Sequence, residues 1–96
     1  MRIRVYSNDG DATARVRRRL LFTLASMDDE IKEAHIVFDA PHTRTEPRLA
    51  RCRVELTLAR GVTVAVEELQ TNPELAVSRA LDRCSRTVRR RLHAAP

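Results

Sequence analysis

Two stretches of alternating residues joined by a short turn constrain this chain more than any other feature. In residues 51–58 every even position is apolar and every odd position is polar, and residues 62–67 alternate valine with threonine, alanine and glutamate. Successive side chains of a strand point to opposite faces of its sheet. With Ala59-Arg60-Gly61 as the turn, the pattern predicts a β-hairpin with one buried and one exposed face.

Two further strands and two irregular segments are expected. Residues 2–6 alternate apolar and polar side chains, and residues 34–38 form a second apolar run bounded by polar residues. Residues 7–11, Ser-Asn-Asp-Gly-Asp, form a turn that could also cap the helix after it. Residues 40–47 are expected to be a loop, because proline stands at positions 41 and 47.

Two helices complete the fold. Val16, Leu20 and Leu24 recur every four residues within a helix predicted over residues 12–27, which the acidic residues 28–30 end. Asn72-Pro73 is a cap residue followed by proline, typical of a helix start. The apolar seam of this last helix comprises Val77, Leu81, Cys84, Val88 and Leu92. We therefore expect one α+β domain over residues 1–96, β-α-β-β-β-α, whose four-stranded sheet carries both helices on one face.

The charge of the chain indicates an anionic partner. The formal net charge is +5, and Lys32 is the only lysine, so the positive charge is almost entirely arginine. A GC-rich genome explains arginine in place of lysine, but it does not explain the positive excess. The planar guanidinium suits phosphate, which favours nucleic acid. One Tyr, two Phe and no Trp weigh against a platform of stacked bases.

The last helix concentrates that positive charge. At about 100° per residue, four side chains fall within roughly 60° of one another and almost opposite the apolar seam: Arg79, Arg83, Arg86 and Arg90. Arg89 and Arg91 extend the charge, and within the segment only Asp82 offsets it. Cations near a helix C-terminus also favour the helix dipole. A row of like charges repels itself, however, and this favours a surface that a polyanion neutralises.

The first helix adds a second cluster of arginines. Arg15, Arg18 and Arg19 project away from its seam, and Arg17 lies at the margin. Phe22 points outward as well, and we expect it to pack against a neighbouring element or a dimer partner. Weaker candidates lie in the loop and on the exposed strand face: Arg44, Arg48, Arg51 and Arg53.

Signals of an enzyme are missing. The histidines, including His42 in the loop, show no metalloprotease spacing, no nucleophile elbow is present, and two glycines provide no phosphate-binding loop. Glu67 and Glu68 point to opposite strand faces, and Cys52 and Cys84 are expected to be buried reduced thiols. We predict no catalytic residue, no cofactor, no metal and no small-molecule substrate. With no signal peptide or membrane span, a cytoplasmic protein with no membrane partner is expected.

Residues 1–92 resemble the hibernation-promoting factor and ribosome-associated translation inhibitor family, also called sigma-factor modulation proteins. The likeness lies in the element order, in residues 52–58 continuing into 64–68, and above all in residues 75–91. That last segment is similar to the family's final helix, with a basic residue every three or four positions. The chain resembles the short members, which lack an appended dimerising domain.

The resemblance implies binding in the mRNA and tRNA channel of the small ribosomal subunit, to its RNA, where translation is blocked and idle ribosomes are protected under stress. Arg83, Arg86, Arg89 and Arg90 stand where the family has RNA-contacting basic residues. The chain departs from the family pattern, with Ser78 in place of an acidic residue, Glu74 at an often aromatic position, Thr23 in place of a lysine, and no glycine just after the first strand. These departures bear on whether ribosome binding is retained.

Two other functions stay open. A diverged member could act as a protein-interaction or dimerising module without ribosome binding, and Phe22 and the missing lysine at Thr23 favour this alternative. A weak homodimer belongs to the same alternative. The second is general binding of double-stranded RNA, which the helices-on-sheet layout loosely resembles.

Overall fold

The computed structural model describes residues 1–41, 43, 46 and 48–93. The predicted loop contains His42, Arg44 and Pro47, which lie outside the described residues. The elements follow the order β1 (Arg2–Ser7), α1 (Ala12–Leu24), η1 (Ala25–Glu30), β2 (Ile31–Asp39), β3 (Ala50–Leu58), β4 (Thr63–Gln70) and α2 (Pro73–His93). The predicted β-α-β-β-β-α order is confirmed, with η1, a short 3-10 helix, as an addition.

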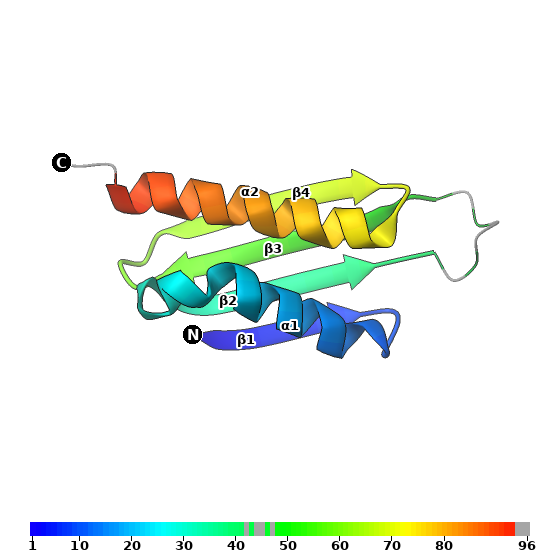
Figure 1. The fold of residues 1–96 in the computed structure, drawn as a ribbon, viewed down its shortest axis with the longest axis horizontal. Helices are drawn as coiled ribbons and strands as arrows, with labels where there is room; N and C mark the ends of the chain where they lie inside the picture. Colours follow the sequence, from blue (N-terminus) through cyan, green and yellow to red (C-terminus); the bar gives the residue numbers. More distant parts are fainter. Residues whose placement is uncertain (42, 44–45, 47, 94–96) are drawn as a thin grey trace.

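The four strands form one sheet in the order β1-β2-β3-β4. β1 and β2 are parallel, whereas β2–β3 and β3–β4 are antiparallel. A parallel pair needs a crossover connection, which α1 and η1 supply. α1 and α2 lie side by side on the same face of the sheet and run in the same direction (Figure 1). The predicted arrangement of both helices on one face is therefore confirmed.

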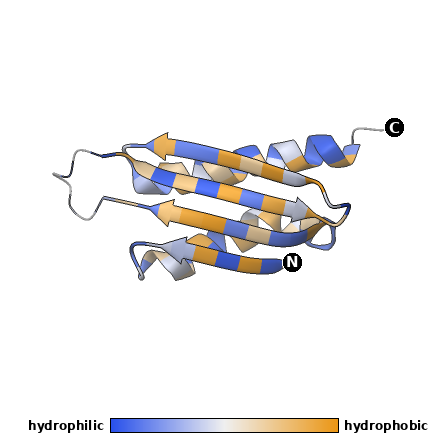
Figure 2. Cartoon of the chain, turned by 180° about the vertical axis from the view of Figure 1, so that it is seen from behind, coloured by the Kyte–Doolittle hydropathy of each residue, from blue (hydrophilic) through white to orange (hydrophobic). Residues whose placement is uncertain are grey.

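The core lies between the sheet and the two helices. The alternation predicted for the hairpin is observed, because Cys52, Val54 and Leu56 are fully buried. They belong to the same core cluster as Leu20 of α1 and Leu81 of α2. The opposite sheet face carries no helix among the described residues, and the view from that side shows hydrophilic and hydrophobic residues alternating along the strands (Figure 2). Truncating a fully buried leucine of this core to alanine would lower the free energy of unfolding by about 2–5 kcal/mol.

The first helix ends earlier than predicted. α1 stops at Leu24 instead of continuing to Met27, and the 3-10 turns of η1 follow. The backbone of Met27 is not helical (φ −116°, ψ 17°), and its side chain turns into the core with 5% exposure. The acidic residues 28–30 also disfavour further helix, since negative charge opposes the dipole at a helix C-terminus.

The turns predicted at residues 7–11 and 59–61 both form, and of the two predicted helix caps only the cap of α2 makes side-chain hydrogen bonds. The side-chain oxygen of Asn72 accepts hydrogen bonds from the backbone N–H groups of Glu74 (2.9 Å) and Leu75 (3.4 Å), so Asn72 caps α2. Gly61 adopts φ 88° in the β3–β4 turn, a conformation that glycine tolerates without strain. Asp11 stands at the N-cap of α1 but makes no capping hydrogen bond with its side chain.

Both cysteines are buried and unpaired, as predicted. Cys52 of β3 and Cys84 of α2 face the layer between sheet and helices, and the Cys84 thiol donates to the carbonyl of Val54 over 3.9 Å. Burial raises the pKa of each thiol to about 12. A neutral thiol at ordinary pH is a poor nucleophile and metal ligand, so these residues serve the core.

Candidate nucleic-acid interface

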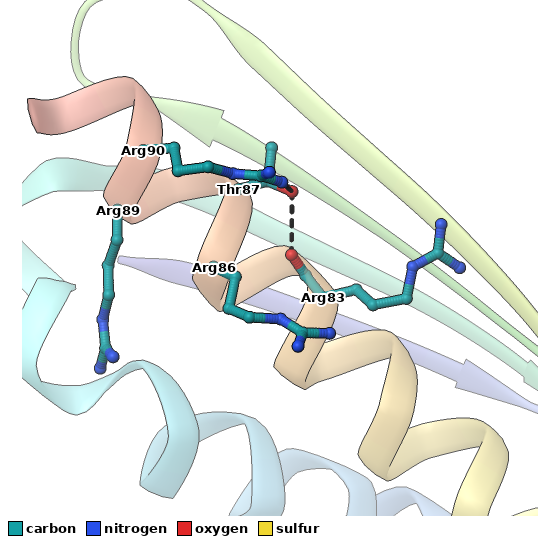
Figure 3. Close-up of a pocket in the computed structure, with 5 residues that line it drawn as sticks. All are labelled: Arg83, Arg86, Thr87, Arg89 and Arg90. Carbon is teal, nitrogen blue, oxygen red and sulfur yellow. Dashed lines mark hydrogen bonds between the residues drawn. The ribbon is translucent and has the colours of Figure 1, made fainter. Parts of the chain in front are cut away.

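The exposed side of α2 is lined by arginines. Its apolar seam faces the sheet, and the same helical period places the polar residues on the far side. All six arginines of the helix are exposed: Arg79, Arg83, Arg86, Arg89, Arg90 and Arg91. Four of them, with Thr87, line a hollow over its C-terminal half, namely Arg83, Arg86, Arg89 and Arg90 (Figure 3). The structure thus brings the predicted arginines of this helix onto one surface.

Arg83 departs from the predicted pattern of unpaired charge. Its guanidinium forms an ion pair with Glu68 of β4 at 3.1 Å and donates to the backbone carbonyl of Glu67 at 3.2 Å. Asp82 is the only acidic residue within residues 79–91, but the structure adds Glu68 from outside that segment. β4 runs beside α2 and turns its even-numbered side chains toward the helices, which places Glu68 within reach of the guanidinium. Arg83 links α2 to the sheet.

The other arginines of α2 keep their charge available. Within the described part of the chain, Arg79, Arg86, Arg89 and Arg91 have no carboxylate partner, and Arg90 donates to the hydroxyl of Thr87 over 3.3 Å. The Thr87 hydroxyl in turn donates to the carbonyl of Arg83 over 2.9 Å, as Figure 3 shows. Six arginines against the carboxylates of Asp82 and Glu68 leave a local net charge of +4. We call this surface the arginine face of α2.

The arginines of α1 lie beside this surface and partly bind α2. Arg19 donates to the hydroxyl of Ser78 over 3.0 Å, and Arg15 approaches the carboxylate of Glu74 at 3.9 Å. Both contacts are exposed, and exposed ion pairs contribute at most about 1 kcal/mol. Arg18 is exposed and has no ion pair among the described residues. Ser78 and Glu74, two of the departures from the family pattern, are thus the α2 residues that bind the arginines of α1.

The weaker candidates occupy a different environment. Arg51 pairs with Glu67 at 3.1 Å on the helix-free face of the sheet, and Arg53 lies 3.6 Å from Glu55 and 3.9 Å from Glu67. Arg48 pairs with Glu46, forms an ion pair with Asp39 at 2.6 Å and donates to the carbonyl of Ala40 at 2.8 Å. These arginines are neutralised by neighbours and hold the sheet and its adjoining loop together. The remaining weak candidate, Arg44, lies outside the described residues.

Other kinds of site find little support in this fold. Across residues 1–41, 43, 46 and 48–93, no group of three or more His, Cys, Asp or Glu side chains is placed to hold a metal ion. Glu67 and Glu68 point to opposite faces of β4, as predicted, since Glu67 pairs with Arg51 and Glu68 with Arg83. Over the same residues, no helix has the length and apolar character that crossing a bilayer requires. The arginine face of α2 is the candidate site.

Comparison with known proteins agrees with this architecture. The chain is similar to the N-terminal domain of protein Y from Thermus thermophilus, with 24% identity and a TM-score of 0.71 over 94% of this chain and 98% of that one. It is also similar to a ribosomal subunit interface protein from Coxiella burnetii, with 16% identity and a TM-score of 0.72 over 94% and 96% of the two chains. At these identities the likeness shows a shared fold. No curated protein gave a significant match.

The fold, the arginine face of α2 and the neighbouring arginines of α1 together define a small α+β domain with a surface suited to anions. The chain belongs to the family described as Sigma 54 modulation protein / S30EA ribosomal protein, whose model matches residues 3–94. The family resemblance found in the sequence is therefore confirmed. The match includes β1 from Ile3 onward, both helices and the whole arginine face of α2.

Proposed function

We propose that residues 1–96 form a single RNA-binding domain that binds the RNA of the small ribosomal subunit in the mRNA and tRNA channel. Occupying that channel would inhibit translation and protect idle ribosomes under stress, and it would place the protein in the cytoplasm. Family membership supports a ribosomal partner, and so does the fold shared with a ribosomal subunit interface protein. The domain would act by occupancy, without catalysis, a cofactor or a metal.

The observation that carries this proposal is the unpaired charge on the arginine face of α2. Four exposed guanidinium groups have no carboxylate or hydroxyl partner within the described residues, and they project from one rigid helix: Arg79, Arg86, Arg89 and Arg91. Arg18 of α1 adds a further unpaired charge, and Arg15 and Arg19 have only exposed partners. Guanidinium groups bind phosphate in a bidentate geometry, and mutual repulsion falls when a polyanion lies across them.

Salt dependence provides the first test. Neutralising on the order of five phosphates releases their counterions, so the logarithm of the binding constant would fall with the logarithm of salt concentration at a slope of about −4. We expect cosedimentation with small ribosomal subunits at low salt and inhibition of translation in cell extract. A slope near zero would contradict binding through phosphate contacts.

A matched pair of variants locates the surface. Replacing Arg86, Arg89 and Arg90 with glutamine removes three charges from α2 without touching Arg83, which is part of the packing against β4. The magnitude of the salt slope should then fall from about 4 to about 2. Cosedimentation with the subunits and inhibition of translation should be largely lost. Replacing Arg4, Arg51 and Arg53 with glutamine removes the same charge from the sheet face and should leave the slope unchanged. Equal effects of the two triple variants would show that the assigned surface is wrong.

Duplex RNA separates the remaining alternative of general double-stranded RNA binding. The arginine face of α2 would bind any phosphate backbone to some extent, whereas a site fitted to the channel prefers intact subunits. We expect a short RNA duplex to compete poorly with small subunits at equal phosphate concentration. Equal competition would favour general duplex binding.

A further inference from the structure

Phe22 is the most exposed large apolar side chain of the described residues. It lies near the C-terminal end of α1 with 82% of its surface exposed, whereas Phe38 is 5% exposed in the core. The expectation that it packs against a neighbouring element of its own chain was therefore wrong. A bare aromatic ring in water is unfavourable, because its burial against a partner would remove a large apolar area from solvent. The Phe22 ring is therefore accessible to a partner from outside the chain.

The surroundings of Phe22 are cationic. Arg18 and Arg19 precede it by four and three positions, which places their Cβ atoms about 5–6 Å from its own. At about 100° per residue, Arg15, Arg18, Arg19 and Phe22 fall within an arc of about 100° on α1. On α2, Arg89 extends away from Arg83 and toward the side where α1 lies (Figure 3). The ring is thus bordered by guanidinium groups.

This combination selects among the partners that could cover the ring. A symmetric dimer formed through Phe22 would bring the same patch of both copies together, so the arginines beside one ring would lie close to those beside the other. Repulsion between these like charges would destabilise such a contact. The partner must instead offer a flat apolar surface and negative charge within a few ångströms of each other. An unpaired nucleotide has both, since its base is a flat π-system and its phosphate is an anion.

We propose that Phe22 stacks on an unpaired base of the bound RNA while the neighbouring arginines hold the flanking phosphates. This inference rests on the proposed function and adds to it the chemical class of the recognised segment, namely single-stranded RNA. A duplex conceals the faces of its bases, so stacking on Phe22 would favour single-stranded segments over paired ones. One ring on a helix also differs from a multi-base stacking platform, which the aromatic content makes improbable.

Substitution of Phe22 separates stacking from electrostatics. Phe22→Ala should weaken binding to small ribosomal subunits about fivefold to hundredfold, with the salt slope unchanged because no phosphate contact is lost. Phe22→Tyr keeps the ring and should bind like the wild type, whereas Phe22→Leu keeps apolar area without the ring and should bind like Phe22→Ala. Arg18→Ala, in contrast, should lower the magnitude of the slope by about 0.7–0.9.

A fluorescent variant detects the proposed contact between residue 22 and an RNA base directly. The chain contains no tryptophan, so Phe22→Trp introduces a single tryptophan, whose emission is excited selectively at wavelengths that Tyr6 does not absorb. Titration with a short single-stranded RNA should quench its emission through base stacking, and a duplex of the same length should quench it far less. No quenching by the single strand, equal quenching by both, or a doubled mass of the wild type in light scattering that Phe22→Ala abolishes would overturn the inference.

The two proposals fail in different ways. If the wild type binds subunits with the expected slope and Phe22→Ala binds equally well, the arginine face is correct and the role of Phe22 is wrong. If the glutamine variants of α2 bind as tightly as the wild type, the proposed function itself is wrong.

Discussion

The two faces of this molecule carry arginines in opposite electrostatic settings. On the helix-free face of the sheet, each of Arg4, Arg51 and Arg53 has a glutamate within 4 Å, on its own strand or a neighbouring one. On the arginine face of α2, only Arg83 has such a partner among the described residues. Exposed arginines are present on both faces, so their presence alone does not distinguish the faces. The placement of carboxylates does, and it marks the helical face as the one that leaves charge for a partner.

The cause of this difference is the secondary structure beneath each face. Strands place residues of neighbouring strands directly opposite each other, so Arg53 meets Glu67 across the β3–β4 register and Arg4 lies next to Glu33 of β2. A helix offers pairing at three or four positions, and on α2 Asp82 is the acidic residue at such a distance, three residues after Arg79 and four before Arg86. Among the described residues it forms no ion pair with either. α2 thus lacks ion pairs within the helix, each of which would contribute a few tenths of a kcal/mol, and its exposed side keeps an excess of positive charge.

The largest effect is expected in the free energy of unfolding at high pH, and it arises at the two cysteines between the layers that carry these faces. Cys52 and Cys84 lie between sheet and helix with pKa values of about 12, and an ordinary thiol loses its proton nearer pH 9. Their stabilising contribution is complete below about pH 9 and is lost as the pH rises toward 12, because only the unfolded chain ionises there. The free energy of unfolding should fall by up to about 1.4 kcal/mol per pH unit for each thiol.

Urea denaturation at a series of pH values measures this decline. The double variant Cys52→Ala and Cys84→Ala is the control, since it has lower overall stability but no titrating thiol. Its free energy of unfolding should depend much less on pH between 9 and 12. An equally steep decline in the double variant would assign the effect to other groups.

The next largest effect sharpens the comparison by removing the carboxylate that pairs with Arg83 on the arginine face of α2. Glu68→Gln releases the charge of Arg83, so RNA binding at low salt should tighten about fivefold and the salt slope should steepen by about 0.7–0.9. Glu55→Gln makes the same change in net charge on the sheet face and should leave the slope unchanged. Equal slopes for both variants would mean that only the overall charge matters. Filter binding over a salt series provides the measurement.

Much of the fold could be predicted from the sequence because its signals are local. The alternation in residues 51–58 and 62–67 gave the hairpin, and the seam through Leu81 gave the last helix, since both patterns depend only on periodicity. The early end of α1 could not be predicted in the same way. It depends on the backbone of Met27, which leaves the helix so that its side chain enters the core.

The sequence predicted which arginines of the candidate site are exposed, but it did not predict which residues they bind within the chain. Exposure follows from helical periodicity, which correctly placed Arg86 and Arg90 opposite the seam. The pairs Arg83–Glu68 and Arg19–Ser78 join elements distant in the sequence, so they depend on how helix and strand are placed. One signal was available: Glu68 continues the even-numbered, helix-facing positions of β4.

A smaller effect is expected at the contact between the helices. Arg19 binds the neutral hydroxyl of Ser78, so its charge is not offset there. Ser78→Asp would convert this hydrogen bond into an ion pair, which should weaken RNA binding about threefold and raise the free energy of unfolding by less than about 1 kcal/mol. Thr63→Asp, an exposed change on β4, is the matched control for charge. If both variants bind equally well, the charge of Arg19 does not contribute to binding.

The smallest effect tests whether ion pairing alone prevents the arginines of the sheet face from binding RNA. Glu67 is the shared partner of Arg51 and Arg53, so Glu67→Gln leaves Arg51 without its partner and Arg53 with Glu55 only. Exposed pairs contribute little, and the free energy of unfolding should therefore drop by only about 0.2–1 kcal/mol. RNA affinity should rise less than it does in Glu68→Gln, because the released arginines of the sheet face point away from the arginine face of α2 and cannot contact the same strand of RNA. A gain in RNA affinity as large as that of Glu68→Gln would show that the two faces bind RNA alike once their carboxylates are removed. The helical arrangement of the arginines would then not matter for RNA binding.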